Sequence, residues 1–275
     1  MKIDFHTHGR LAKRLPFSEI YTEWLFEQAR AAGLDALCLT EHFNTVQFGE
    51  IYRYLFSVGR MEGDSIVLEN GLRIFPGMET DIAEGGHILT IGCAQENSRN
   101  STNAWSPTKK RDPSCPFEEL MELFSDYQVL VGGAHPYRAG GHIPELPQES
   151  IRQLDFFDMN GKDVALDRER TETLTKALGE KYQIPIIAGS DTHQALQYGC
   201  IFTEMWYDVD TISKLYGEIR RRNYHIVVSD QAREKVESAA LLKRNLKGIH
   251  AEGGNYVAAL FEELRGKVTE RAREL

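Results

Sequence analysis

The sequence is poor in cysteine and has no long apolar run. Its four cysteines, Cys38, Cys93, Cys115 and Cys200, form no Cys-x-x-Cys pair, so neither a zinc knuckle nor a disulfide framework is expected. No run of about 18 apolar residues occurs, which argues against a membrane-spanning helix, and the first residues contain no apolar signal core. We therefore expect a soluble, cytoplasmic protein with reduced thiols.

An excess of basic residues is also missing. The chain has 41 acidic and 32 basic residues, which gives a formal net charge of −9. Nucleic acids and anionic membranes repel such a chain, so we expect neither a nucleic-acid duplex nor a membrane among its partners. Divalent cations held at one place would reverse the sign of the charge locally, so a small anion could still bind there. The sequence leaves the oligomeric state open.

Short apolar segments alternate with longer amphipathic segments. Strands are predicted over residues 2–5, 36–40, 72–75, 87–92, 129–133, 154–159, 184–188, 201–207 and 225–229. Helices are predicted from an N-cap at Ser18 to a stop at Gly33, and over residues 48–61, 117–124, 164–182, 212–221 and most of 231–275. This alternation is typical of parallel strands joined by crossover helices. We expect one α/β unit over residues 1–229 and a helical C-terminal extension over 230–275 that packs on it.

Six of the nine histidines lie at or next to the end of a predicted strand. For all but one of them it is the C-terminal end, and the six are His6, His8, His42, His87, His135 and His193. In α/β barrels the loops that leave the C-terminal ends of the strands converge on one mouth. The sequence therefore predicts that these imidazoles meet in one site, whereas His225 and His250 are expected to be structural or on the surface.

Two strand ends repeat the same spacing of polar residues. Asp4, His6 and His8 are two residues apart and project to one side of an extended strand, where two imidazoles can hold one metal ion. Asp4 is either a further ligand or a residue that orients a histidine from behind. Asp191 and His193 repeat the pattern after another strand. One such pair could be a polar strand end whose side chains only hydrogen-bond within the protein. Two such pairs on separate strands make that explanation less convincing.

A carboxylate follows a third strand. Glu79 is predicted to lie in a glycine-flanked turn after this strand, and a carboxylate with two oxygens can bridge two cations that are about 3.5–4 Å apart. His87 follows a pair of glycines, and His135 lies in Gly-Gly-Ala-His-Pro. His42 follows Glu41 after the second predicted strand. By itself it is weak support for a metal site, because a single histidine after a strand is common.

Taken in order, these motifs resemble the polymerase and histidinol phosphatase (PHP) family. The resemblance rests on D-F-H-T-H at residues 4–8, T-E-H at 40–42, G-M-E at 77–79 with G-H-I-L at 86–89, A-H-P at 134–136 and G-S-D-T-H at 189–193. No single motif is specific, but the set is. The resemblance implies a distorted (β/α)7 barrel with a metal site at the C-terminal ends of its strands. It does not extend to the last 45 or so residues.

The resemblance also implies two or three divalent metal ions, of zinc, manganese or iron. A first ion would be held by His6, His8, Glu79 and Asp191, a second by the bridging Glu79 with His87 and His135, and a third by His42 and His193. Members of the family that bind three metals often have another histidine in the loop after the first motif, but residues 9–16 contain none. Glu41 also stands where aspartate is common.

The chemistry that follows is the hydrolysis of a phosphate monoester. Two cations that share Glu79 can share a water molecule and lower its pKa, so that hydroxide becomes the nucleophile. Besides Glu79, we expect Asp191 and His193 to take part in catalysis. For binding of the phosphate we expect Arg138 first, because guanidinium matches phosphate bidentately, and then Arg10 and Arg14.

Two further features are weaker candidates. His142 follows two glycines near the expected mouth and could protonate the leaving group. The basic run at residues 109–111 lies in a long loop, residues 95–116, and either closes over the substrate or is a solvated patch.

The sequence therefore predicts a metal-dependent phosphoesterase that acts on a small phosphorylated metabolite, such as a histidinol-phosphate-like compound or a nucleotide. Alternatives are a metal-dependent amidohydrolase or deacetylase, a non-catalytic metal-binding regulatory module, and a scaffold that uses the helical tail. Amidohydrolases of this kind commonly bridge their metals with lysine, which Glu79 disfavours. Neither the substrate nor the metal can be read from the sequence.

Overall fold

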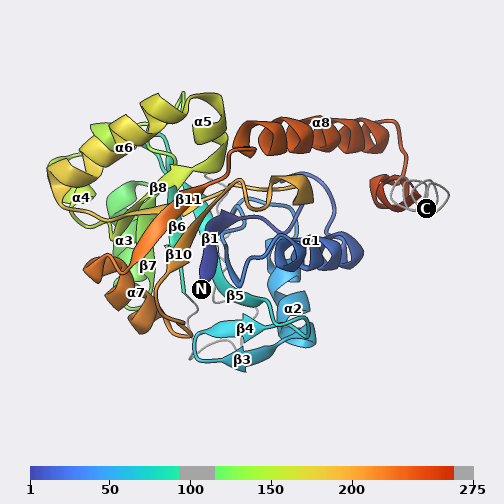
Figure 1. Ribbon diagram of the computed structural model, residues 1–275, viewed down its shortest axis with the longest axis horizontal. Helices are drawn as coiled ribbons and strands as arrows, with labels where there is room; N and C mark the ends of the chain where they lie inside the picture. Colours follow the sequence, from blue (N-terminus) through green and yellow to red (C-terminus); the bar gives the residue numbers. More distant parts are fainter. Residues whose placement is uncertain (93–114, 263–275) are drawn as a thin grey trace.

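A strongly twisted sheet forms a nearly closed barrel with helices on its outside (Figure 1). The computed structural model describes residues 1–92 and 115–262. The strands that surround the barrel are, in order, β1 (Lys2–Thr7), β2 (Ala36–Leu39), β5 (Arg73–Asp81), β6 (His87–Ile91), β7 (Leu130–Gly133), β8 (Phe156–Asn160) and β9 (Ile186–Gly189). The predicted fold class, a distorted α/β barrel with a helical extension, is confirmed.

The barrel closes where the segment after β9 meets the end of β1. The backbone N–H of Asp191 donates a hydrogen bond to the carbonyl of His6 (2.7 Å), and the N–H of His8 donates to the carbonyl of Thr192 (3.0 Å). The two backbones approach so closely at Gly189 that a Cβ there would lie 2.3 Å from the Cβ of His6. This seam, formed by residues 6–8 and 189–192, therefore joins the two motifs that share the two-residue spacing.

The prediction of purely parallel pairing is wrong at β6. This strand runs antiparallel to both β5 and β7. Its link to β5, residues 82–86, is too short for a crossover, which needs a dozen residues or more. The link instead turns through Gly85 and Gly86, whose φ angles of 90° and 112° favour glycine. As a result, the N-terminal end of β6 lies beside the C-terminal ends of the other strands.

Further strands extend the sheet at two places. β10 (Ile201–Met205) pairs antiparallel with β1, and β11 (Tyr224–Val228) pairs with β10. β3 (Arg60–Glu62) and β4 (Ser65–Val67) form a hairpin beside β5. The predicted helix over residues 48–61 is three residues shorter, because Gly59 is extended (φ −115°, ψ 166°) and leads into β3.

Most helices begin and end near their predicted bounds. α1 (Glu19–Ala31) begins after Ser18, whose hydroxyl accepts a hydrogen bond from the N–H of Tyr21, so the predicted N-cap is confirmed. The other helices are α2 (Phe48–Val58), α3 (Phe117–Phe124), α4 (Gln148–Ile151), α5 (Gly161–Leu166), α6 (Arg168–Tyr182), α7 (Ile212–Arg221) and α8 (Ala232–Ala251), with short 3-10 helices η1 (Ile143–Glu145) and η2 (Ala195–Gln197).

The long helix α8 runs from beside α5 towards the side of α1 (Figure 1). Side chains of its first turn anchor it on both flanks. Arg233 donates to the carbonyl of Ala165 on α5 (3.2 Å), and Lys235 donates to the carbonyl of Tyr198 just after η2 (3.1 Å). Farther along, residues of the extension join the apolar core around α1, namely Leu246, Tyr256 and Leu260. Within residues 1–92 and 115–262, no helix is both long and apolar enough to cross a membrane.

Candidate metal centre

The six predicted histidines meet at one end of the barrel. Five of them follow the C-terminal ends of β1, β2, β7 and β9 or belong to β1 itself, and His87 opens β6. His87 reaches the same mouth only because β6 is antiparallel, so that its first residue lies opposite Asp81 at the end of β5. The reversed strand thus explains why the one histidine at an N-terminal strand end still belongs to the site.

Glu79 lies at the centre and is almost fully buried. The prediction of a turn around it is wrong, because β5 continues to Asp81 and Glu79 pairs with Leu89 of β6. Its Oε2 atom is 3.3 Å from Nε2 of His6, 3.4 Å from Nε2 of His8 and 2.8 Å from Nδ1 of His42. Its Oε1 atom faces the other way, towards Nδ1 of His87 (2.5 Å) and Nε2 of His135 (3.3 Å). The two oxygens of one carboxylate therefore face two separate groups of imidazoles.

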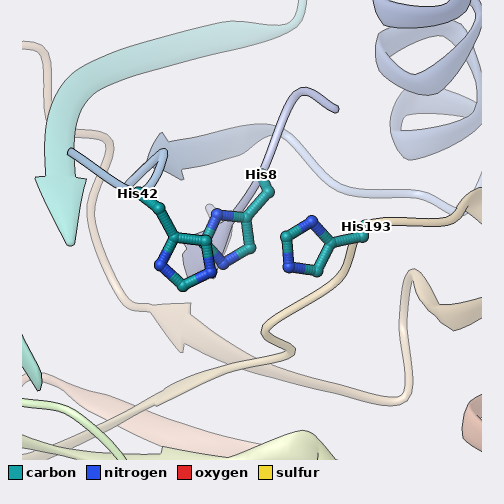
Figure 2. A group of neighbouring side chains, drawn as sticks. All are labelled: His8, His42 and His193. Carbon is teal, nitrogen blue, oxygen red and sulfur yellow. The ribbon is translucent and has the colours of Figure 1, made fainter. Parts of the chain in front are cut away.

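Three groups of side chains bring possible ligand atoms within 4.8 Å of one another. They are His6, His8 and Glu79; Glu79, His87 and His135; and His8, His42 and His193. Figure 2 shows the third group, in which the ring of His8 lies parallel to that of His193 with 3.9 Å between ring centres and lies 4.4 Å from the ring of His42. The expected ligands are thus brought together as three overlapping sets.

Unpartnered polar atoms show that cations fit this donor set. Nε2 of His6, both ring nitrogens of His8, Nδ1 of His42 and Oε2 of Glu79 are buried, and none makes a hydrogen bond within the described residues. Buried polar atoms are rarely left so, because an unmade hydrogen bond costs about 1–3 kcal/mol. Imidazole nitrogens and carboxylate oxygens that face one another in this way are ligands that divalent ions such as zinc, manganese or iron accept.

Hydrogen bonds behind the imidazoles fix their orientation. Nδ1 of His6 lies 2.9 Å from Oδ2 of Asp158, and Nδ1 of His193 donates to the backbone carbonyl of Arg10 (2.9 Å). In His193 the Nε2 atom therefore faces the centre with its lone pair. In His6 the Nε2 atom faces Glu79 and Asp191; burial lowers the pKa of His6, but these two carboxylates hold it well above its usual range. Such partners make an imidazole a better ligand and hold its ring in place.

Asp191 completes the site from the seam. Its Oδ1 atom is 3.3 Å from Nε2 of His8 and 3.8 Å from Nε2 of His6. Two cationic side chains hold the same carboxylate, since Lys162 approaches Oδ1 (2.9 Å) and Arg138 donates to Oδ2 (2.7 Å). The backbone of Asp191 is left-handed (φ 56°), a conformation that is uncommon outside glycine and often marks functional sites.

The two central carboxylates are ionised. Burial raises the pKa of Glu79, but the imidazoles of His42 and His6 outweigh burial and hold this pKa well below its usual range. Burial likewise raises the pKa of Asp191, and Lys162 and His6 more than compensate, so this pKa is also well below its usual range. Both groups therefore carry the negative charge that a metal ligand needs.

The histidines differ in their protonation. Burial lowers the pKa of His42 to about 4 and lowers that of His193 well below its usual range, so both imidazoles are neutral. Burial also lowers the pKa of His87, but hydrogen bonds to Asp81 and Glu79 raise it to about 9. The proton between His87 and Glu79 lies where the resemblance implies a cation, which would displace it.

Asp4 and Glu41 support the site from behind. Oδ1 of Asp4 accepts hydrogen bonds from the N–H groups of Ser190 (2.8 Å) and His6 (3.2 Å), and burial raises the pKa of Asp4 to about 7. Glu41 is buried with Oε1 3.7 Å from Nδ1 of His8. Each of the two carboxylates is therefore placed to orient the residues beside it.

The residues predicted to bind phosphate lie in very different surroundings. Arg138 makes four hydrogen bonds, to Asp163, Asp191 and Asn160. Arg10 is buried, and its guanidinium donates to the carbonyls of Val46 and Gln47.

The two remaining candidates lie outside the buried centre. Arg14 is exposed, and His142 is exposed with its Nδ1 3.0 Å from Oε2 of Glu145. The basic run at residues 109–111 and most of the long loop that contains it lie outside the described residues. Cys93 does so too, whereas the other cysteines, Cys38, Cys115 and Cys200, are free.

Sequence reasoning missed several polar residues that follow or end β8. Asp158 contacts His6, Asn160 accepts a hydrogen bond from Arg138, and Asp163 pairs with the same guanidinium. A signal was present in Phe156-Phe157-Asp158-Met159-Asn160, where polar residues alternate with apolar ones in a fully buried strand. Such alternation predicts polar groups that face a site rather than solvent.

Neither a family model nor a curated protein matches this sequence. Solved structures do match. The crystal structure of PsfC from Pseudomonas syringae PB-5123 aligns with a TM-score of 0.71 and 19% identity, over 89% of this chain and 98% of that one. The lesion-specific endonuclease PfuEndoQ from Pyrococcus furiosus aligns with a TM-score of 0.58 and 18% identity.

A third structure is that of Endonuclease Q in complex with a 27-mer duplex that has an abasic lesion at the active site. It aligns with a TM-score of 0.59 and 18% identity, over 80% of this chain but only 56% of that one. These likenesses show a shared fold. They also correct one expectation: because this fold accommodates a DNA duplex in Endonuclease Q, excluding a nucleic-acid duplex on net charge alone was wrong.

Proposed function

We propose that this protein is a metal-dependent phosphoesterase of the PHP type. One observation carries the proposal: each oxygen of Glu79 faces its own group of imidazoles, as a carboxylate that bridges two cations must. The motifs that resemble the PHP family supply these same residues. The fold shared with Endonuclease Q adds support, because that enzyme acts on DNA at an active site.

The residues would divide among the ions as the resemblance implies. His6, His8, Glu79 and Asp191 would hold a first ion, Glu79, His87 and His135 a second, and His42 and His193 a third. The structure adds His8 to this last group. When bound, such ions neutralise phosphoryl oxygens and lower the pKa of water, so that hydroxide is available near neutral pH. The identity and the number of the ions are part of the proposal.

The protein's own residues prepare the site for this chemistry. Glu79 and Asp191 are ionised and held rigidly, so no reorganisation is needed when charge develops on a substrate. His193 keeps its proton on Nδ1 through the carbonyl of Arg10, which leaves Nε2 unprotonated and directed at the centre. Arg138 and Lys162 add positive charge beside Asp191.

A phosphate ester fits this site better than an amide does. Glu79 lies between the two groups of imidazoles. Related barrels that hydrolyse C–N bonds commonly have a lysine or carboxylated lysine at this position. Two or three dications suit a dianionic phosphate more than a neutral amide. We propose a small phosphorylated metabolite as the substrate, and a phosphodiester in DNA is the second candidate because of the fold shared with Endonuclease Q.

The first prediction is that Asp191→Ala and His135→Ala each abolish hydrolysis of an aryl phosphate, by at least about a thousandfold, and leave the circular dichroism spectrum unchanged. Each variant removes one ligand from a different ion. The matched control is His225→Ala, because His225 is exposed on β11 and its imidazole pairs with Glu204 (3.0 Å). Full activity in either ligand variant would disprove the metal assignment.

Metal analysis together with a substrate panel decides between the candidate substrates. The panel should contain an aryl phosphate, histidinol phosphate, nucleotides, an acylated amine and a duplex with an abasic site. Turnover of the phosphate monoesters alone supports a metabolite phosphatase, and cleavage of the duplex alone supports a nuclease. Turnover of only the acylated amine, or protein without affinity for divalent ions, would refute the proposal.

A further inference from the structure

Lys243 of α8 faces the barrel instead of solvent. Residues Ala239, Lys243 and Leu246 are spaced four and three residues apart, so they lie on one stripe of the helix. Ala239 and Leu246 are almost fully buried, and Lys243 between them is half-buried. A lysine on the inner stripe of an otherwise exposed, highly charged helix is unusual and calls for a reason.

The helix brings this lysine to the mouth of the site. α8 packs on α5, which carries Lys162, and on η2, which begins two residues after His193. Lys243 is close enough to interact electrostatically with Lys162, Asp191 and His193. An element from the far end of the sequence therefore adds positive charge beside the seam.

Lys243 has no hydrogen-bond or ion-pair partner within residues 1–92 and 115–262. The carboxylates of Asp191 and Glu41 act on its ammonium group only from a distance. Burial, and after it the neighbouring Lys162 ammonium, lower the pKa of Lys243 to about 7. A half-buried ammonium beside another one costs free energy, and a bound anion would offset that cost.

The other cations at the mouth differ in how far they are occupied. All three nitrogens of the Arg138 guanidinium donate hydrogen bonds to Asp163, Asp191 and Asn160, so that group serves the carboxylates. Lys162 uses one of three donors on Asp191 and is about one-third exposed. Lys162 and Lys243 thus both have donors left for a ligand.

We propose that Lys162 and Lys243 form an anion subsite at the mouth, built jointly by α5 and α8, which binds an anionic oxygen group of the substrate. The inference rests on the proposed function and deepens it, because it assigns the C-terminal extension a part in substrate recognition. The bound group is either the phosphate that is cleaved or a second acidic group on the same molecule. Lysine suits both, since it acts as a point charge without a fixed bidentate geometry.

The second prediction tests binding without catalysis. Inorganic phosphate is titrated calorimetrically into the protein as purified, with its metal content measured in parallel. Lys243→Gln should weaken phosphate binding about tenfold, the usual worth of a charge-assisted hydrogen bond that is partly exposed, and should leave the metal content unchanged. The matched control is Arg244→Gln, because Arg244 lies on the same helix, is exposed and carries the same charge.

Kinetics then identify the bound group. If the subsite holds the phosphate that is cleaved, Lys243→Gln raises KM about tenfold for every phosphate ester, with little change in kcat. If it holds a second acidic group, KM rises for a carboxyphenyl phosphate but not for an unsubstituted phenyl phosphate. Both patterns support the subsite, and Lys243→Arg should restore part of the loss in either case.

Stability separates this role from a structural one. Because Lys243→Gln removes a half-buried charge without a partner, its Tm should stay the same or rise, whereas loss of a structural lysine would lower it. The proposal is overturned if Lys243→Gln changes neither the affinity for phosphate nor the KM for carboxyphenyl phosphate, or if Arg244→Gln changes them equally. Weaker phosphate binding in Lys243→Gln combined with no esterase activity would leave the subsite standing and remove the proposed function instead.

Discussion

At the scale of single residues, Glu79 organises the site because its two oxygens are not equivalent. Oε2 meets His6, His8 and His42, while Oε1 meets His87 and His135. An aspartate at this position would be one methylene shorter and could not reach both groups from the same backbone position. Bridging therefore depends on the length of this side chain as much as on its charge.

The third prediction concerns Arg138. Because its guanidinium joins Asp191 to Asp163 and Asn160, Arg138→Ala should release Asp191 and weaken metal binding about 10–100-fold, as is typical when a partner of a metal ligand is lost. Competition with a chromogenic chelator measures this. If instead KM for phosphate esters rises while metal affinity is unchanged, Arg138 binds substrate, as its position after His135 in the sequence predicts.

The meeting of these histidines and carboxylates could be predicted because they belong to short motifs with strand spacing. A spacing of two residues indicates side chains on the same face of a strand, and both His6 with His8 and Asp191 with His193 show it. Asp158 and Lys243 could not be recognised in this way, since each acts alone on a residue that is distant in the chain. Their roles depend on which strand or helix becomes the neighbour of which, and no local pattern encodes that.

At the scale of elements, the direction of β6 could not be predicted from the alternation of apolar and amphipathic segments. Its residues are almost all buried, as in β5 and β7, and only the length of the link before it distinguishes a hairpin from a crossover. Gly85 and Gly86 mark that link as a turn. The placement of most other elements was predictable because apolar periodicity and caps such as Ser18 are local signals.

The fourth prediction tests the seam between β9 and β1. A Cβ at Gly189 would lie 2.3 Å from the Cβ of His6 and 2.5 Å from its backbone nitrogen, neither of which can move away easily. Gly189→Ala should therefore destabilise the protein by about 1–3 kcal/mol and lower its metal content, because His6 is displaced. Chemical denaturation and metal analysis measure the two effects.

Gly248→Ala is the control for this prediction. A Cβ at Gly248 in α8 meets no atom within 4 Å, so this change should leave the metal content as it is and stabilise the helix by up to about 1 kcal/mol. Equal losses in both variants would mean that the effect of Gly189→Ala does not come from the close approach to His6.

At the scale of the whole molecule, net charge proved a poor guide to partners. The value of −9 averages over a surface on which acidic residues are widespread, whereas a substrate meets only the mouth. There, bound cations and side chains such as Lys162 and Lys243 decide the potential. The duplex held by Endonuclease Q shows that the fold itself does not exclude a polyanion.

The fifth prediction is that removal of the metal ions lowers the stability of the whole protein. An ion present at about 1,000 times its Kd adds about 4 kcal/mol, and 1 kcal/mol shifts Tm by about 2–4 °C in domains of roughly this size. A strong chelator should therefore lower Tm by about 10 °C or more, and added zinc or manganese should restore it. An unchanged Tm in calorimetry would argue against ions in the buried centre.

Acidification should act in the same direction. Burial lowers the pKa of His42 to about 4, whereas a histidine in the unfolded chain titrates near 6.5. Between these values the unfolded state binds more protons than the folded state, so the contribution of His42 to stability falls as the pH falls through this window. Protonation also competes with cations for the same nitrogens.

The seam has a consequence for anyone who redesigns this protein. The backbone contacts that fasten the last barrel strand to the first lie within two residues of Asp191, His6 and His8. The same short segments thus close the barrel and carry the residues of the site, so a change to one of these features also changes the other. New termini or inserted domains belong at the opposite rim of the barrel, where a cut would spare both.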